Sequence, residues 1–449
     1  SRPRRMSCSA LSHSNSVPLF AATMLTIALS AGAPAASAQT AKQSARAYID
    51  LATYGSDIPG IGMMSGARGG DQSAGGLGML GGMLSGAVSG ATGNTAGGGN
   101  TFGTTHAGGF SATGRFMDVS VRAMKNPSLA EAAQAIPGSM MLGNSLKLVS
   151  PPDAKPAPDD DDKPIEPNYE KPKGRISIYW GCGETVRAGQ PRTLDMAKAS
   201  MDEYAKIFVA RSSTTRGARL QPGHPSWPSK VDERRVPDSA SIAGENAFSG
   251  NGIPENFKFN LGAAQDLMPA IELNQRKNGG AVMLDWKPIP HARGYFISAM
   301  GGKSGGDSGE MIIWTSSELP DAGFGLMNYQ TNASIDKWLK EKVLLQPGTT
   351  QCAVPNGIFG NDGGGMLSMI AYGSEGYFSY PPRPANAGKS WEQVWQAKVR
   401  VKSSFTSMLG GMEQRGGRAD GQEDRETGRD YTSQGRESQG GGTPGVGDV

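Results

Sequence analysis

With 449 residues, the chain is long enough for two or three domains of roughly 150 residues each and for a sizeable buried core. Lysine and arginine together number 44 against 41 aspartate and glutamate residues, which gives a net charge of +3. This near balance argues against nucleic acid as the main partner, because phosphate binding needs a basic surplus gathered on one face.

The N-terminal residues 1–38 have the pattern of an export signal. Arginines lie near the start, residues 17–29 are apolar, and the small residues of 36–38 provide a cleavage site. The apolar run is shorter than the ~20 residues of a membrane-spanning helix, so the pattern favours export over a membrane anchor. We therefore expect an exported protein whose mature chain begins at Gln39.

Two cysteines, Cys182 and Cys352, would remain after removal of such a signal. In an oxidising compartment a pair of this kind is able to form a disulfide, here across about 170 residues. Two separate buried thiols explain the same count, and the sequence alone leaves both arrangements open.

Residues 39–265 are expected to form a β-rich N-terminal domain. Apolar and polar residues alternate at 44–54 and 115–123, which predicts two strands that pair with each other. A further strand is expected at 175–180. Between them, Ser128 and Glu131 have the spacing of a capping box and predict a short helix.

Two segments interrupt this domain. Residues 62–113 are rich in glycine, and glycine or alanine recurs at every fourth position from Gly62 to Gly90. Such spacing gives a helix a smooth packing face, but each glycine destabilises a helix by about 1 kcal/mol. We favour a loop over a glycine-zipper or membrane-touching helix. Residues 150–174 are acidic and proline-rich, which predicts a surface loop.

Residues 266–403 are expected to form a second domain. Its strongest pattern lies at 281–300, where two alternating runs flank a proline-containing turn with His291 and predict a core hairpin. Apolar residues at helical spacing predict a helix at 332–343. The glycine-rich polar tail at 404–449 is expected to be disordered.

Part of this second domain carries a family resemblance. Leu284-x-Trp286, Ala292-x-Gly294-Tyr295 and the run MLSMIAYG lie within a region that resembles a fibronectin type III or immunoglobulin-like sandwich. The resemblance covers about a quarter of the chain and implies a scaffold, which does not by itself carry a function. The whole chain is similar to exported bacterial proteins of uncharacterised function. The expected fold class is mainly β, with two β-sandwich-like domains and short inserted helices.

Short motifs typical of catalytic sites occur in the sequence, but the residues that such sites also require do not accompany them. Gly306-Asp307-Ser308-Gly309 has the form of a serine-protease nucleophile, but neither His224 nor His291 lies in the histidine context of those enzymes. The histidines are not spaced for metal binding with cysteine or with each other. We therefore predict no catalytic residues, no cofactor and no metal.

Tryptophans provide the only candidate binding residues. Trp180, Trp286 and Trp314 lie inside apolar strands and are expected in the core, whereas a second set lies in polar context and is expected to be exposed. The candidate binding aromatics of this second set are Trp227, Trp391 and Trp395.

The leading hypothesis is an exported, non-catalytic protein of the bacterial envelope or cell surface with a structural or binding role. Its partner would be an envelope protein or a polysaccharide, with no nucleic acid, and membrane association is not favoured. One alternative is a secreted hydrolase whose site is assembled from residues far apart in the sequence. Another is a membrane-associated assembly factor that uses the glycine-zipper segment.

Overall fold

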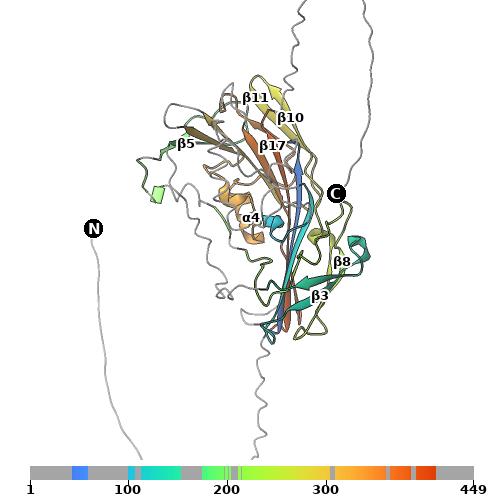
Figure 1. The fold of residues 1–449 in the computed structure, drawn as a ribbon. Coiled ribbons are helices and arrows are strands. Elements are labelled where there is room, and N and C mark those ends of the chain that lie inside the picture. Colours follow the sequence, from blue (N-terminus) through green and yellow to red (C-terminus); the bar gives the residue numbers. More distant parts are fainter. Residues whose placement is uncertain are drawn as a thin grey trace, which may run out of the picture.

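Strands dominate the protein, as its alternating sequence patterns predict. The computed structural model describes residues 43–58, 100–106, 113–152, 174–196, 198–200, 202–203, 211–213, 215–303, 309–359, 365–385 and 391–410 (Figure 1). The mainly-β fold class is confirmed within these ranges. The predicted signal segment, the glycine repeat and most of the acidic loop and tail lie outside them.

Most strands belong to one large sheet of 14 strands. In spatial order its main path is β6 (Arg192–Asp195), β5 (Arg175–Trp180), β13 (Glu310–Thr315), β12 (Gly294–Lys303), β15 (Met366–Tyr372), β17 (Trp395–Met408), β1 (Ala45–Ser56), β2 (Gly114–Ala123), β7 (Ser226–Trp227), β4 (Ser145–Val149), β3 (Glu131–Ala135), β8 (Gly244–Ser249) and β9 (Lys258–Leu261). Strand β16 (Gly376–Tyr380) pairs with the first half of β17, on the same side as β15.

A smaller sheet contains β10 (Leu273–Asn278), β11 (Ala281–Trp286) and β14 (Gln351–Val354). The helical elements are α4 (Asn332–Lys340) and the 3-10 turns η1 (Thr104–His106), η2 (Gly138–Met140), η3 (Ala263–Gln265) and η4 (Phe324–Leu326). The predicted helix at 332–343 therefore forms, whereas the one predicted after Ser128 is wrong, because Glu131 begins β3 instead.

Strands from the two ends of the chain lie side by side at the centre of the large sheet (Figure 1). β1 pairs in parallel with β17, from Ala45 opposite Trp395 to Ser56 opposite Thr406, and pairs on its other side with β2. The expected division at residue 266 is therefore not a division between sheets. Strand β17 also continues to Met408, so residues 404–408 belong to the sheet rather than to the predicted tail.

The predicted hairpin at 281–300 is wrong in its pairing. Both strands form, but β11 pairs with β10 and β14, whereas β12 pairs with β13 and β15. Pro288 and Pro290 lie in the connection, which leads the chain from the small sheet into the large one. His291 has the turn role that its context predicts, with a left-handed φ of 62°.

The core joins both sheets. Trp286 and Trp314 are buried as predicted, and Trp286 packs edge-on against Tyr295 of β12 with 5.6 Å between the ring centroids. Helix α4 covers β12 and β15 through Ile335 and Trp338. Its first turn is capped by Thr331, whose side chain accepts a hydrogen bond from the backbone N–H of Ser334 at 3.2 Å.

Cys182 and Cys352 form a disulfide bond. Cys182 follows β5 of the large sheet and Cys352 lies in β14 of the small sheet, so the bond ties the two sheets together. The structure thus selects one of the two arrangements that the sequence leaves open.

Removing this disulfide by the double change Cys182→Ser/Cys352→Ser is expected to lower the free energy of unfolding by about 2–4 kcal/mol, because the closed loop restricts the unfolded chain. Urea unfolding of the oxidised protein and of the variant measures the difference. Reduced wild-type protein is the matched control and should unfold like the variant. Equal stability of the oxidised and reduced protein would contradict the prediction.

No helix in the described ranges is long and apolar enough to cross a membrane.

Candidate functional site

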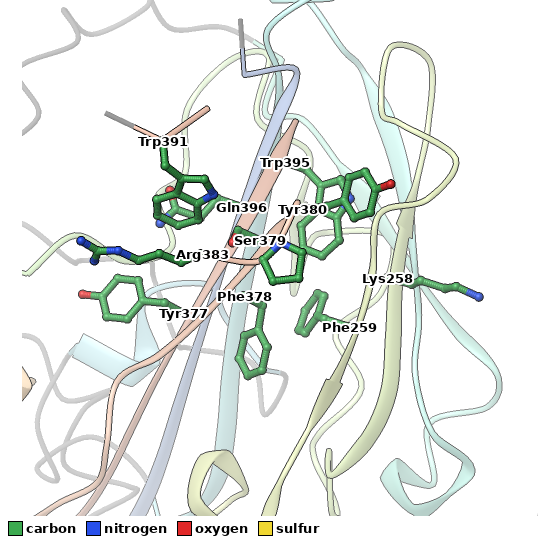
Figure 2. A pocket seen from close by; sticks show the side chains of 11 residues that line it. Lys258, Phe259, Tyr377, Phe378, Ser379, Tyr380, Arg383, Trp391, Trp395 and Gln396 are labelled. Atoms are coloured by element: carbon green, nitrogen blue, oxygen red, sulfur yellow. The ribbon is translucent and has the colours of Figure 1, made fainter. Parts of the chain in front are cut away.

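A pocket of about 750 Å³ lies among β9, β16 and the start of β17 (Figure 2). Among the described strands, β9 pairs only with β8, and β16 pairs only with β17. β9 and β16 touch through Phe259 and Phe378, whose rings stack with 5.0 Å between centroids. The pocket therefore combines segments more than a hundred residues apart in the sequence.

Aromatic rings make up most of the pocket wall. The lining residues are Lys258, Phe259, Tyr377, Phe378, Ser379, Tyr380, Pro382, Arg383, Trp391, Trp395 and Gln396. No leucine, isoleucine, valine or methionine is among them. Tyr377 and Tyr380 are 56% and 47% exposed, a large fraction for side chains of this size.

The rings are held by contacts within the protein. Trp395, the first residue of β17, stacks on Phe257 with 4.6 Å between centroids and lies beside Tyr380 at 6.3 Å. The indole N–H of Trp391 donates a hydrogen bond to the Pro381 carbonyl at 3.2 Å. The Arg383 guanidinium lies 5.6 Å from the centre of the Trp391 ring. These contacts fix the platform in advance, which reduces the entropy that a ligand would lose on binding.

The polar groups of the pocket are mainly donors. Lys258 and Arg383 are exposed cations, and no aspartate or glutamate is among the lining residues. The indole N–H of Trp395 finds no acceptor in the part of the chain that the structure describes, although the residue is only 3% exposed. The nitrogen itself is buried, so this N–H is not a donor at the pocket surface.

Two of the three predicted binding tryptophans meet in this pocket. Trp391 is partly exposed as expected, whereas the expected exposure of Trp395 is wrong, because aromatic neighbours cover all but its edge. The expected exposure of Trp227 is wrong as well. Its proline-rich context suggests a loop, but Trp227 lies in β7 between β2 and β4 and is fully buried.

The sequence interpretation missed the exposed tyrosines. Tyr377 and Tyr380 lie in β16, and an aromatic residue in a strand is usually part of the core. The signal available was the sequence Tyr380-Pro381-Pro382-Arg383, in which an aromatic ring is followed at once by a rigid, charged turn.

A second concentration of polar groups lies inside the protein and touches the pocket through Tyr377. The Tyr377 hydroxyl donates to Glu375 at 3.1 Å, and Glu375 forms an ion pair with Lys398 of β17 at 2.9 Å. Two residues further along β17, Arg400 forms a two-point ion pair with Asp50 of β1, at 2.7 and 2.6 Å. Both of these side chains are buried.

The Asp50–Arg400 pair is well satisfied. The backbone N–H of Ala218 donates to Asp50 at 2.9 Å, and His106 contacts the same carboxylate at 3.0 Å. Burial acts to raise the pKa of Asp50, but the charge and hydrogen bonds of Arg400, with a contribution from His106, hold it well below its usual range. The carboxylate is therefore ionised throughout the neutral range.

A second buried carboxylate, Asp118 of β2, holds the segment at 100–106 against the sheet. It accepts hydrogen bonds from the backbone N–H groups of Gly103 and Thr105, at 3.1 and 3.2 Å, and from the Thr105 hydroxyl. Burial raises the pKa of Asp118 to about 6, and burial likewise lowers the pKa of the neighbouring Lys402 ammonium to about 7.

The contacts of these buried charged residues indicate a structural role, because they join β1, β2 and β17 to the segments that cover them. Within the described ranges, no hydroxyl or thiol is hydrogen-bonded to His106, so the His106–Asp50 contact does not activate a nucleophile there. The described residues also contain no group of three His, Cys, Asp or Glu side chains placed to hold a metal ion.

Asp118 is expected to make stability fall as pH rises from about 4 to 6. The folded protein keeps this proton up to about pH 6, whereas an unfolded aspartate loses it near 3.8, so ionisation favours unfolding across that window. The shift corresponds to at most about 3 kcal/mol, since one pKa unit is about 1.4 kcal/mol.

Urea unfolding of wild type and Asp118→Asn at several pH values checks this contribution. The difference in unfolding free energy between the two proteins should change between pH 4 and 6 and stay flat from 6 to 7. A difference that is constant from pH 4 to 7 would contradict the raised pKa.

Comparison with models of known protein families and with curated protein sequences gives no match for this chain.

Proposed function

We propose that the protein is an exported, non-catalytic binding protein of the bacterial envelope or cell surface, and that it holds a saccharide chain in the aromatic pocket. The observation that carries the proposal is the pocket wall, in which six of the eleven described lining residues are aromatic and one is proline. Flat rings match the apolar C–H faces of sugar rings, and the polar groups at their edges match hydroxyls.

The described lining residues include no aliphatic side chain, which favours a saccharide over a lipid or an apolar peptide as the ligand. A lipid chain or an apolar peptide side chain binds best where flexible aliphatic groups close around it, and the pocket lining has none. A proline-rich peptide is the other ligand that aromatic grooves accept, and it is included in the tests below.

Binding without cleavage follows from the charges of the lining. Glycoside hydrolysis generally needs two carboxyl groups that flank the scissile bond. No aspartate or glutamate is among the described lining residues, and Glu375, the carboxylate bonded to Tyr377, is itself paired with Lys398. These observations favour a binding role over the alternative of a secreted hydrolase.

Two features support an extracytoplasmic location. Residues 1–38 have the pattern of an export signal. The Cys182–Cys352 disulfide is of the kind that forms and persists in oxidising compartments. The glycine-zipper alternative rests on residues outside the described ranges.

Alanine at Trp391 or Tyr380 is expected to weaken saccharide binding about 10-fold each, because each change removes one stacking surface worth about 1.4 kcal/mol. Affinity electrophoresis in gels that contain xylan, dextran or polygalacturonate measures the retardation of each protein. Leu220→Ala is the matched control, since Leu220 is 54% exposed and lies outside the pocket.

The proposal predicts that at least one polysaccharide retards wild type and Leu220→Ala equally and retards the two pocket variants much less. Equal retardation of all four proteins, or of none by any polysaccharide, would overturn it.

A further inference from the structure

We infer that the ligand of the pocket is an acidic saccharide, a chain of sugars that bear carboxylates, with Arg383 and Lys258 as its counter-charges. This inference rests on the proposed saccharide-binding function and names the class of saccharide. It is carried by the charge of the lining and by the placement of Arg383 over the Trp391 ring.

The described lining of the pocket is positively charged. Arg383 and Lys258 both line it, and no aspartate or glutamate is among the described lining residues. No aspartate or glutamate of the described residues forms an ion pair with either cation. A ligand that bears carboxylates would match this charge.

Arg383 is already placed for such a contact. Its guanidinium lies over the Trp391 ring, which restricts the side chain and leaves its planar N–H edge available. That edge matches a carboxylate through two parallel hydrogen bonds, which a lysine does not reproduce. A uronate stacked on the aromatic platform would place its carboxylate beside this group.

The two cations lie on different sides of the ring cluster. Figure 2 shows Arg383 and Lys258 projecting away from each other, with Phe378, Tyr380 and Trp395 between them. A single acidic sugar reaches only one of them, whereas a chain with repeated carboxylates reaches both. The geometry therefore favours a polymer.

Short oligogalacturonates and their fully methyl-esterified forms are the matched probes, because they differ only in charge. Isothermal titration should show the acid bound at least 10-fold more tightly than the ester at low salt, with the difference reduced as salt is added. Arg383→Gln should remove most of that difference, because the acid loses much more affinity than the ester. Arg383→Lys should restore part of it.

A synthetic peptide with the sequence of residues 151–173 is the peptide probe, since it is both acidic and proline-rich. Acid and ester bound equally, with no effect of Arg383→Gln, would overturn the acidic class, while loss of binding in Trp391→Ala would still support the saccharide pocket. Binding of the peptide with no binding of either saccharide would overturn both the inference and the proposed function.

Discussion

Asp50→Ala is expected to lower the free energy of unfolding by about 3–5 kcal/mol, since removing one partner leaves a buried charge without compensation. Arg400 is 4% exposed and makes both of its ion-pair contacts to this carboxylate. Its other described contacts include the Thr215 carbonyl, the His106 ring and the face of Tyr329 at 4.3 Å, none of which carries a negative charge. Asp50 also joins β1 to β17, the two strands at the centre of the sheet.

Urea unfolding with the single variants and with Asp50→Leu/Arg400→Met tests the origin of this loss. Replacing both charges by apolar groups of similar size should recover most of the stability that either single change removes. Lys147→Ala is the matched control, because its ion pair with Glu131 is exposed and is worth less than about 1 kcal/mol. Asp50→Ala within 1 kcal/mol of wild type would contradict the buried pair.

Trp395→Ala is expected to destabilise the protein by about 3–5 kcal/mol, because a large side chain leaves a cavity when it is truncated in a packed environment. Trp395 is 3% exposed, opens β17 and stacks on Phe257. Trp391→Ala removes the same kind of side chain from a partly exposed position and is expected to alter stability by less than about 1 kcal/mol.

Thermal and urea unfolding of these two variants distinguish the two tryptophans. Trp395→Phe keeps a ring at this position, so it should be more stable than Trp395→Ala. If Trp395→Ala and Trp391→Ala were equally stable, the assignment of Trp395 as the structural base of the pocket would fail.

Local pattern was enough to find most strands but not their partners. The alternation in residues 44–54 and 115–123 predicts β1 and β2, which pair as expected. It cannot show that β1 also pairs with β17, because strand pairing depends on edge matching between segments about 350 residues apart. The wrong prediction of a hairpin at 281–300 has the same cause. The sequence pattern identified each strand correctly, but it did not show that the proline-containing connection leads from the small sheet to the large one.

The sequence pattern did not show that the charged residues of β17 are buried, because this pattern usually belongs to a strand that is exposed on one side. In β17, Lys398, Arg400 and Lys402 alternate with alanine and valines, which is typical of a strand with one solvent-facing side. That side is instead covered by loops from residues 215–218 and 328–329, which contribute Thr215, Asn328 and Tyr329. Only the folded chain brings this cover into place.

Only part of the pocket could be predicted from the sequence. Polar context around Trp391 and Trp395 suggested a binding role, and both residues line the pocket. Phe259 and Lys258 come from β9, so no local signal connected them to the tryptophans. Arg383 lies in a proline-rich turn, and it contacts the ring of Trp391, eight residues further along the chain. The sequence pattern gave no sign of this contact.

Hydrogen exchange of the wild-type protein with and without oligogalacturonate tests the central claim, that the aromatic pocket is the ligand site, without assuming where the ligand binds. Among the described strands, β9 pairs only with β8 and β16 only with β17, so backbone groups on their other sides are open to a bound chain, which should slow exchange there. We expect protection at residues 258–261 and 376–383. Protection confined to other parts of the chain at saturating ligand, such as residues 100–106, would contradict the claim.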